Sequence, residues 1–475
     1  MTSTTTRDRY RPRLHYTPAR NWINDPNGLV FHRGIYHLFY QHNPFGTDWG
    51  NMSWGHATSR DLHTWTEQPV AIACDESESI FSGSAVVDES NTSGLGDGVT
   101  PPMVAIYTSA YGPSSSRPGI QAQSLAYSLD EGQTWTKYAG NPVLDRGSAN
   151  FRDPKVFRYE GAAGASWVMV AVEAEEQRVL LYTSANLIDW EFLSDFRMAA
   201  PGAGVWECPD LFELPVEGEP GRTVWVLVVS TNPGGVAGGS GTRYFLGEFD
   251  GVRFAEIPGT QSWLDWGRDY YAAVSFNGLP ADDAWPARRV MIGWMNNWDY
   301  AAATPTDAWR SAMSLPRELA LRSLDGRLRL VQRPVVPASS DSTQTSSLVL
   351  PRGEACRVRV SAPATGIFGV RFSSGDGDAA TLAVDPAAGE VRLDRTSSGL
   401  VDFHESFASV ERAPLDDLDG RVELDVFVDA CSLEVFVQGG LATITDLVFP
   451  RGEQLGIEVF ADPQVTVDAV EVGRL

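Results

Sequence analysis

The chain has 475 residues, of which 43% are hydrophobic, and a formal net charge of −24 at pH 7. This length exceeds one ordinary core, so we expect two domains. The acidic balance excludes nucleic acid and anionic membranes as partners, because both require clustered Lys and Arg. A neutral ligand is favoured. The 15 Trp and 14 Tyr suit carbohydrate, whose ring faces stack on aromatic side chains, although aromatic residues also fill β cores.

Short strands fill the chain from about residue 13 to residue 333. Runs rich in β-branched and aromatic residues recur between turn residues, and segments with a helical period are nearly absent. The clearest runs are 29–31, 36–40, 104–107, 167–172, 224–229 and 290–294. We therefore predict an all-β fold for this part of the chain.

A weak internal repeat refines this prediction. Four times, a strand leads to an Asx turn and then to an aromatic residue that opens the next strand. The four copies are Ser59-Arg-Asp61 with Trp65, Ser128-Leu-Asp130 with Trp135, Ser184-Ala-Asn186 with Trp190, and Glu248-Phe-Asp250 with Phe254. A spacing of about 55 to 70 residues matches one four-stranded blade and predicts a five-bladed β-propeller. Four unrelated hairpins are the alternative, since Asx turns are common.

A polar stretch divides the chain. Pro334-Val-Val-Pro337 is followed by a run of Ser, Thr, Asp and Gln, which indicates a linker. Beyond it, segments 422–428, 433–437 and 456–460 alternate apolar and polar residues, a pattern typical of strands buried on one face. We predict a propeller domain at 10–335, a linker at 336–347 and a C-terminal β-sandwich at 348–475.

Neither a cofactor nor a metal is expected. The four cysteines are scattered without ligand-like spacing and are predicted to be free thiols. The histidines at positions 32, 37 and 42 are five residues apart, a spacing that suits neither a strand face nor a helical zinc motif. The N-terminus lacks an apolar segment of signal-peptide length, and no run could span a membrane. The chain as given is expected to be cytoplasmic, or secreted if the sequence has been trimmed.

Three acidic stretches are the candidates for chemistry. They are Trp22-Ile-Asn-Asp25-Pro-Asn-Gly28, Phe151-Arg-Asp153-Pro154 and Trp206-Glu207-Cys-Pro-Asp210. Each places a carboxylate in a Pro- or Gly-bearing turn beside an aromatic residue or a cation. Paired carboxylates in different environments are the usual equipment for cleaving a glycosidic bond. Each stretch alone also has a structural reading, as an ordinary turn, an ion pair or a strand end.

These stretches resemble glycoside hydrolase family 32, the invertases, levanases and exo-inulinases. The resemblance also includes Phe81-Ser-Gly-Ser84 and covers nearly the whole chain. Trp54-Gly-His-Ala-Thr-Ser, the Gly238–Phe245 run, Asp269-Tyr-Tyr-Ala and Ile292–Trp298 are similar to the levanase and exo-inulinase branch. The family fold, a five-bladed propeller with a β-sandwich, agrees with the reading above. The resemblance implies a retaining, exo-acting β-fructosidase that hydrolyses levan, inulin, fructo-oligosaccharides and sucrose.

The resemblance also implies residue roles. Asp25 is expected to be the nucleophile, Glu207 the general acid/base, and Asp153 the residue that holds sugar hydroxyls and stabilises the transition state. Eight residues are expected to bind the terminal fructosyl unit: Asn24, Gln41, Trp49, Phe81, Ser82, Arg152, Tyr271 and Trp294. Trp49 and Trp294 have an alternative reading as core aromatics, and Gln41 as a residue that satisfies a strand edge.

The two principal carboxylates are expected to differ in their surroundings. Amide donors around Asp25 keep a carboxylate ionised, whereas Trp206 and Cys208 beside Glu207 predict poor solvation and a raised pKa. Arg152 is expected to keep Asp153 charged. A retaining mechanism requires the carboxyl groups of Asp25 and Glu207 to lie about 5 to 5.5 Å apart.

Several rival readings remain at this point. Ser128–Trp135 resembles the Asp box of sialidases, but an acidic protein suits an anionic sugar poorly. Propeller arabinanases and xylosidases invert and lack the paired motifs, and a non-catalytic fructan-binding module needs no intact carboxylates. A fructosyltransferase or a difructose-releasing levan hydrolase would share the same three carboxylates. The Gly-rich run from Gly234 to Gly241 has no Lys or helix after it, so a mobile loop is predicted rather than a phosphate site.

Overall fold

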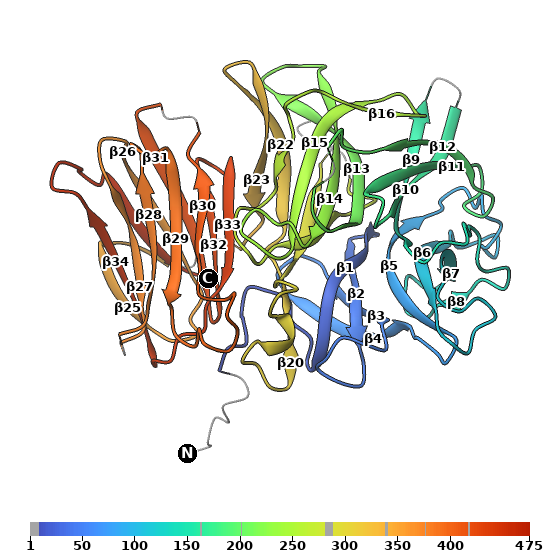
Figure 1. Ribbon diagram of the computed structural model, residues 1–475, viewed down its shortest axis with the longest axis horizontal. Helices are drawn as coiled ribbons and strands as arrows, with labels where there is room; N and C mark the ends of the chain where they lie inside the picture. The colour runs from blue at the N-terminus through green and yellow to red at the C-terminus, as the bar shows by residue number, and fades with distance from the viewer. Residues whose placement is uncertain are drawn as a thin grey trace.

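The computed structural model describes residues 9–161, 164–200, 202–280, 288–337, 341–375, 377–416 and 419–475. These residues form two β bodies that lie side by side in Figure 1. Within them, helical structure is limited to the 3-10 turn η2 (Ala301–Ala303), and no helix is long and apolar enough to cross a membrane. The all-β prediction is confirmed.

The N-terminal body is built from five antiparallel blades. The first blade contains β1 (Asn21–His32), β2 (Ile35–Asn43), β3 (Ser53–Ser59) and β4 (Trp65–Ile72), with β20 (Trp309–Arg310) added beside β1. The second contains β5 (Glu78–Val87), β6 (Met103–Tyr111), β7 (Gln121–Ser128) and β8 (Thr136–Lys137). The third contains β9 (Phe151–Gly161), β10 (Gly164–Glu173), β11 (Arg178–Ser184) and β12 (Glu191–Phe196).

The last two blades share a short parallel contact between β13 and β22. The fourth blade contains β13 (Val205–Glu217), β14 (Thr223–Asn232), β15 (Gly241–Phe249), β16 (Phe254–Glu256) and β17 (Ser262–Trp263). The fifth contains β18 (Tyr271–Ser275), β19 (Val290–Met295), β21 (Ala312–Met313), β22 (Arg317–Leu324) and β23 (Arg327–Pro334). The innermost strands β1, β5, β9, β13 and β18 contact one another in a closed ring, which confirms the five-bladed propeller.

Every innermost strand carries an irregularity in its pairing with the next strand. The interruptions fall at Asn24–Asp25 of β1, Ser82 of β5, 153–154 of β9, 208–209 of β13 and 272–273 of β18. Bulges re-aim side chains and are common beside active sites. Asp153, Cys208 and Ala272 adopt positive φ angles of 62°, 46° and 52° at these points. The five bulges therefore turn side chains toward one end of the central channel.

The repeat read from the sequence corresponds to the outer hairpin of four blades. In the first, the Asp61 carboxylate accepts hydrogen bonds from the backbone N–H groups of His63 and Thr64, and the Trp65 indole donates to the carbonyl of Leu62. Matching turns at Asp130, Asn186 and Asp250 precede the fourth strands of the next three blades. These contacts confirm the predicted Asx turns.

The C-terminal body is a sandwich of two six-stranded sheets. One sheet has the order β24 (Asp341–Gln344), β35 (Ala469–Arg474), β26 (Cys356–Pro363), β31 (Arg421–Asp429), β32 (Ser432–Val437) and β33 (Ala442–Leu447). The other has the order β25 (Ser347–Pro351), β34 (Gln454–Ala461), β27 (Phe368–Ser373), β28 (Ala379–Asp385), β29 (Glu390–Ser397) and β30 (Val410–Pro414). Val358, Val426, Val370 and Leu382 lie in the core between them.

Two predictions about this region need correction. Residues 341–344 lie inside the predicted linker, yet they form β24 and pair with β35; residues 338–340 lie outside the described part of the chain. Backbone pairing does not require apolar side chains, so a polar run can form an edge strand. Strand β32 is buried on both faces, not one, because its outer face covers the propeller.

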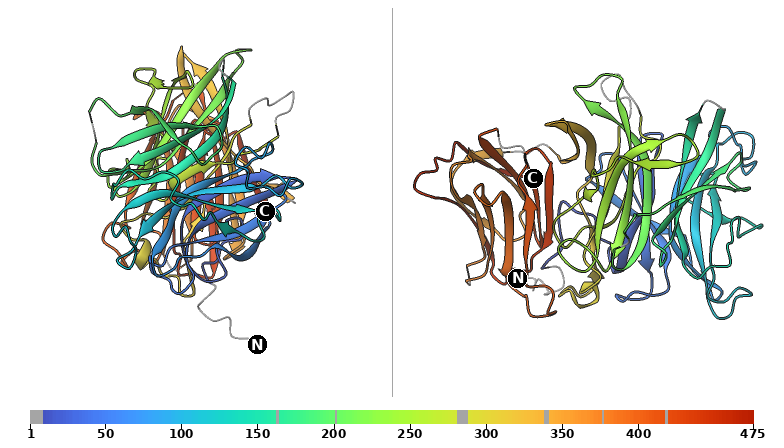
Figure 2. Two further views of the ribbon diagram at one scale, coloured as in Figure 1. Left: turned by 90° about the vertical axis from the view of Figure 1, so that its right-hand side faces the viewer. Right: turned by 45° about the horizontal axis from the view of Figure 1, so that its top comes forward.

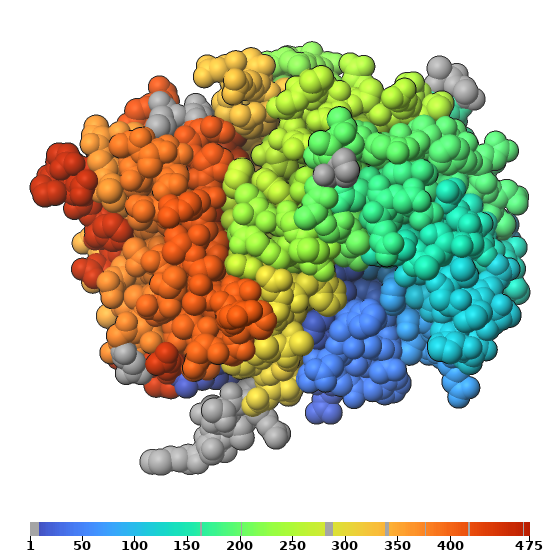
Figure 3. Space-filling model, in the orientation of Figure 1, coloured from blue at the N-terminus to red at the C-terminus, as the bar shows by residue number. Residues whose placement is uncertain are grey.

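The sandwich packs against the side of the propeller rather than across its axis. The two bodies lie side by side in the right-hand view of Figure 2, and the space-filling view shows the sandwich meeting residues of about 260 to 315 (Figure 3). The N-terminal residues also reach the sandwich. His15 is fully buried, and its ring nitrogens lie 2.8 Å from Asp429 Oδ2 and 2.7 Å from Glu434 Oε1.

Candidate active site

The three predicted carboxylates converge at one end of the channel. Asp25 lies on β1, Asp153 on β9 and Glu207 on β13, each at a bulge or next to one. Cys208 links two of them: its backbone N–H donates to Asp153 Oδ2 at 3.0 Å, and its thiol lies 3.5 Å from Asp25 Oδ2. Arg152 Nη2 donates to Glu207 Oε1 at 3.1 Å, and Arg152 Nε lies 3.8 Å from Asp153 Oδ2. The bulges thus assemble one polar cluster.

Asp25 is surrounded by the expected donors. Ser82 Oγ donates to Asp25 Oδ2 at 2.7 Å, and the Asn24 amide donates to Asp25 Oδ1 at 3.0 Å. The Trp22 indole fixes that amide by donating to Asn24 Oδ1 at 2.8 Å. Burial and the charge of Glu207 nevertheless raise the pKa of Asp25 above its ordinary value, and the two hydrogen bonds only moderate this rise.

Asp153 is buried more deeply than its turn-like sequence suggests. Burial is the largest influence and raises the pKa of Asp153, with smaller contributions from Glu207 and Asp25, while Arg152 opposes the rise. The backbone N–H of Asp153 donates to Thr108 Oγ1 at 3.0 Å, which holds the left-handed turn. The expectation that Arg152 keeps this carboxylate charged therefore describes only one of two opposing effects.

The surroundings of Glu207 differ from those expected. Trp206 packs against Phe196 and Phe245, away from the carboxylate. The Glu207 side chain is 22% exposed, and its carboxylate accepts hydrogen bonds from Arg152 and from the Tyr271 hydroxyl. The expected apolar environment is wrong because sequence neighbours on a strand point to different faces. The partners of Glu207 come from the third and fifth blades instead.

Aromatic side chains stand at the rim of the cluster. Trp49 is 52% exposed, and its ring centroid lies 6.0 Å from that of Phe81 in an edge-to-face arrangement. Both residues line a cavity of about 210 Å³ together with Tyr111 and Gln121. An exposed indole beside polar groups offers a surface for a sugar ring. This placement agrees with the substrate contacts expected for Trp49 and Phe81.

Five of the eight predicted substrate-binding residues are buried: Asn24, Gln41, Ser82, Tyr271 and Trp294. Trp294 has no exposed surface and packs against Trp22, Tyr271 and Trp298, so its position is that of a core aromatic. Gln41 is 2% exposed, lies opposite the β1 bulge, and donates from Nε2 to the carbonyl of Ile80 at 3.0 Å. Asn24 and Ser82 contact Asp25 and Tyr271 contacts Glu207, whereas no side-chain hydrogen bond links Trp294 or Gln41 to these carboxylates among the described residues.

A buried ion pair closes the channel below the carboxylates, and sequence reasoning missed it. Lys155 Nζ lies 3.4 Å from Asp210 Oδ2 and also donates to the carbonyl of Ser275. Asp210 Oδ2 in turn accepts from the backbone N–H and hydroxyl of Ser275, both at 2.7 Å. A void that Asp153 and Lys155 both line measures about 10 Å³, too small for a sugar. Lys155 follows Asp153 by two residues and Asp210 ends the Glu207 motif, so the motifs themselves contained this signal.

A larger cavity, of about 700 Å³, lies at the other end of the innermost strands. Phe31, Phe157, Phe212 and Asn277 line it, and the three predicted carboxylates do not. Lys155 and Asp210 separate the two ends of the channel.

The Gly-rich run is held in place. Asn297 Nδ2 donates to the carbonyls of Gly238, Ser240 and Arg268 at 3.2, 3.3 and 2.7 Å. A Cβ at Gly239 would lie 2.1 Å from Asn297 Oδ1, which explains the need for glycine there. These contacts bind the loop to the fifth blade and argue against the predicted mobility. Within the described residues, we find no cluster of three side chains that could hold a metal ion.

This arrangement defines the class of protein. Three carboxylates with different partners lie beside an exposed tryptophan, at the closed end of a propeller channel. Paired carboxyl groups in different environments are what acid-assisted cleavage of a glycosidic bond requires. The protein is a glycoside hydrolase.

Comparisons with known proteins identify the family. The family model for the glycosyl hydrolases family 32 N-terminal domain matches residues 15–334, and that for the family 32 C-terminal domain matches residues 328–473. The chain belongs to glycosyl hydrolase family 32, as its motifs predicted.

Individual relatives agree with this assignment. The chain is 45% identical over 474 residues to a levanase of Bacillus subtilis strain 168, in an alignment that covers 95% of this chain and 68% of the levanase. It is 43% identical to an extracellular exo-inulinase of Aspergillus niger, with 97% and 93% covered. A crystal structure of exo-inulinase from Aspergillus awamori superposes with a TM-score of 0.89 at 40% identity and covers 98% of both chains. A fructofuranosidase from Schwanniomyces occidentalis complexed with fructose also gives a TM-score of 0.89, at 31% identity over 99% of both chains.

Proposed function

We propose that the enzyme removes terminal β-D-fructofuranosyl units from levan, inulin, fructo-oligosaccharides and sucrose, with retention of anomeric configuration. The single observation that carries this proposal is the grouping of Asp25, Asp153 and Glu207 at a closed channel end. The similarity to a levanase and to exo-inulinases directs the proposal to fructans. The net charge of −24 supports a neutral polymer as the substrate rather than a polyanion.

The contacts suggest which carboxylate takes part in each step of the reaction. Asp25 attacks the anomeric carbon, and its donors Ser82 and Asn24 favour the ionised carboxylate that this attack needs. Glu207 donates a proton to the departing oxygen, and in the second step it takes a proton from the water that releases fructose. Asp153 accepts hydrogen bonds from sugar hydroxyls, and these bonds strengthen as positive charge develops on the ring.

The closed channel supports attack from the chain end. A polymer cannot pass Lys155 and Asp210, so only a terminal unit reaches the carboxylates. Trp49 and Phe81 lie at the rim, where the leaving part of the chain would rest. Fructosyl transfer is not favoured, because the similar proteins include a levanase and exo-inulinases, whose names describe hydrolysis.

Product analysis tests the proposal. Levan, inulin and sucrose are incubated separately with the enzyme, and the products are separated by chromatography at early times. Free fructose is the expected first product from both polymers, and the initial anomer in the NMR spectrum is the β form. Asp25→Asn should abolish all three reactions, whereas the matched control Asp61→Asn, in an outer Asx turn, should leave them intact. Difructose or longer products at early times would contradict the exo assignment, and an inverted anomer would contradict retention.

A further inference from the structure

Residues 264–269 of the propeller, which we call the interface segment, connect the sandwich to the strand that leads to the catalytic carboxylates. The backbone of this segment lies along β33: Trp266 N–H donates to the carbonyl of Thr443 at 2.9 Å, and Asp269 N–H donates to that of Thr445 at 3.0 Å. Gly267 permits this approach, because a Cβ there would lie 2.2 Å from the Thr445 carbonyl oxygen. The interface segment continues directly into β18, the innermost strand of the fifth blade.

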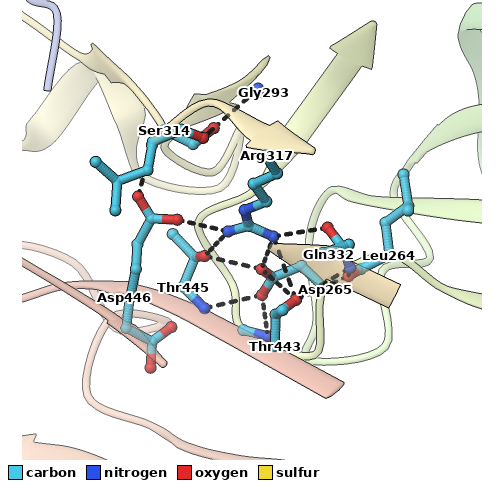
Figure 4. Close-up of polar contacts among 12 residues, drawn as sticks. Leu264, Asp265, Gly293, Ser314, Arg317, Gln332, Thr443, Thr445 and Asp446 are labelled. Atoms are coloured by element: carbon cyan, nitrogen blue, oxygen red, sulfur yellow. Dashed lines mark hydrogen bonds and ion pairs between the residues drawn. The ribbon is translucent and has the colours of Figure 1, made fainter. Parts of the chain in front are cut away.

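A buried arginine fastens the start of the segment. Asp265 Oδ2 lies 2.9 Å from Arg317 Nη1 and accepts hydrogen bonds from the hydroxyls of Thr443 and Thr445 at 3.0 and 2.8 Å. Figure 4 shows this cluster, with Arg317 of the propeller facing the two threonines of the sandwich. Arg317 Nη2 also donates to Glu434 Oε2 of the sandwich at 2.6 Å, and Arg317 Nη1 donates to Gln332 Oε1 at 3.0 Å.

A second buried arginine, from the sandwich itself, fastens the end of the segment. Arg395 on β29 donates from Nη1 to Asp269 Oδ2 at 2.6 Å, and the backbone N–H of Leu447 donates to the same oxygen at 2.8 Å. The Tyr300 hydroxyl donates to Asp269 Oδ1 at 2.6 Å. Asp269 and Arg395 have no exposed surface, so neither charge can exchange its partner for water.

Asp269 lies two positions before Tyr271, which contacts the catalytic cluster. The hydroxyl of Tyr271 donates to Glu207 Oε2, and the ring of Tyr271 is fully buried. Tyr270 lies between Asp269 and Tyr271 in the sequence, and the Arg317 guanidinium lies over its ring, 4.0 Å from the ring centroid. Ala272 follows with a φ of 52°, so the chain is in a left-handed turn where it enters the propeller. A shift of Asp269 would therefore move the Tyr271 hydroxyl.

We propose that Arg395 of the sandwich is a positioning residue for the acid/base of the propeller. Arg395 fixes Asp269, Asp269 fixes the beginning of β18, and the Tyr271 hydroxyl then aims the Glu207 carboxyl at the leaving oxygen. This inference rests on the proposed function, because it takes Glu207 as the proton donor. It gives the second domain a part in proton transfer that is separate from its packing against the propeller.

The test compares two substrates of different leaving groups. Sucrose needs a proton on its departing oxygen, whereas β-D-fructofuranosyl fluoride does not, and kcat/KM reports the step that forms the fructosyl enzyme. Arg395→Lys should lower kcat/KM for sucrose at least about 10-fold more than for the fluoride, since a positioned general acid contributes 10² or more. Arg357→Lys is the control for an arginine substitution elsewhere in the sandwich, because Arg357 forms a bidentate but partly exposed ion pair with Asp425 and has no propeller partner among the described residues. It should leave both substrates unaffected.

A double-mutant cycle separates positioning from general damage. Tyr271→Phe alone should lower the sucrose-to-fluoride ratio, and Arg395→Lys should lower that ratio little further in the Tyr271→Phe background. Equal losses on both substrates, or fully additive effects on the ratio, would overturn the proposal. An unchanged ratio in Tyr271→Phe alone would overturn it as well.

Two further measurements separate a folding defect, and a failure of the proposed function, from a failure of the positioning role. Melting temperatures identify variants that fail to fold; if Arg395→Lys is one, Asp269→Asn takes its place in the same cycle, because it keeps the side-chain shape and removes the charge. Wild-type enzyme that releases no fructose from sucrose or levan would refute the proposed function itself. Active wild-type enzyme with an unaffected ratio in the variants would refute only the positioning role.

Discussion

His15 provides a quantitative test of the contact between the two domains. Burial alone would lower the pKa of His15, but its hydrogen bonds to Asp429 and Glu434 outweigh burial and raise the pKa to about 9 from an ordinary 6.5. The imidazole is fully buried, so solvent does not screen these bonds. At about 1.36 kcal/mol per pKa unit, this rise corresponds to about 3 kcal/mol of folding free energy.

The sign of the effect follows from the direction of the shift. A group with a raised pKa stabilises the fold fully below pH 6.5, and this contribution is lost as the pH rises through about 9. With an unfolding entropy of about 2.1 cal/mol/K per residue, the full contribution amounts to about 3 °C in Tm for this chain. His15→Gln keeps a hydrogen-bonding side chain but cannot carry the proton.

Scanning calorimetry between pH 6 and pH 10 measures this contribution. The Tm difference between wild type and His15→Gln should shrink by about 3 °C over this range, because only the wild type loses the buried proton. His63→Gln, on an outer loop of the first blade, controls for loss of an imidazole and should show no such trend. A wild-type-minus-variant difference that is constant with pH would refute the reasoning.

Three further predictions concern the catalytic cluster. Ser82→Ala removes a hydrogen bond to the Asp25 carboxylate and should lower kcat/KM for sucrose by about 10-fold or more. The matched control Ser84→Ala should change kcat/KM little, because Ser84 lies on the same strand but accepts a hydrogen bond from a backbone N–H. Arg152→Gln removes the charge that holds down the pKa of Asp153, so the acidic limb of the kcat/KM profile should move to higher pH, and an unmoved limb would contradict this. Asp153→Asn should lower kcat strongly with a modest change in KM, and a change mainly in KM would indicate a ground-state binding role instead.

The sequence predicted the parts of the protein that depend on local chemistry. Asx turns at Asp61 and Asp130 follow from side-chain bonds to nearby backbone, so they could be recognised and counted as blades. The carboxylates Asp25, Asp153 and Glu207 stood in recognisable motifs, and the fold brings all three together.

What the sequence could not predict depends on partners from other blades. Glu207 was expected to be poorly solvated because of Trp206, but the bulge in β13 aims its carboxylate at Arg152 and Tyr271. Adjacency in sequence, on which that expectation rested, does not show which groups surround a side chain on a strand, and the bulge changes its direction further. The fifth blade also decides two other features. It buries Trp294, and through Asn297 it holds the Gly-rich run, which lies far away in the sequence.

The ion pair of Lys155 and Asp210 also determines how a long substrate must be consumed. Because the channel ends at this pair, a freed sugar has one exit, which is the opening through which the chain end entered. The shortened polymer occupies that opening until it withdraws. Each cleavage therefore requires the shortened chain to withdraw from the opening before the freed sugar can leave and the next unit can enter.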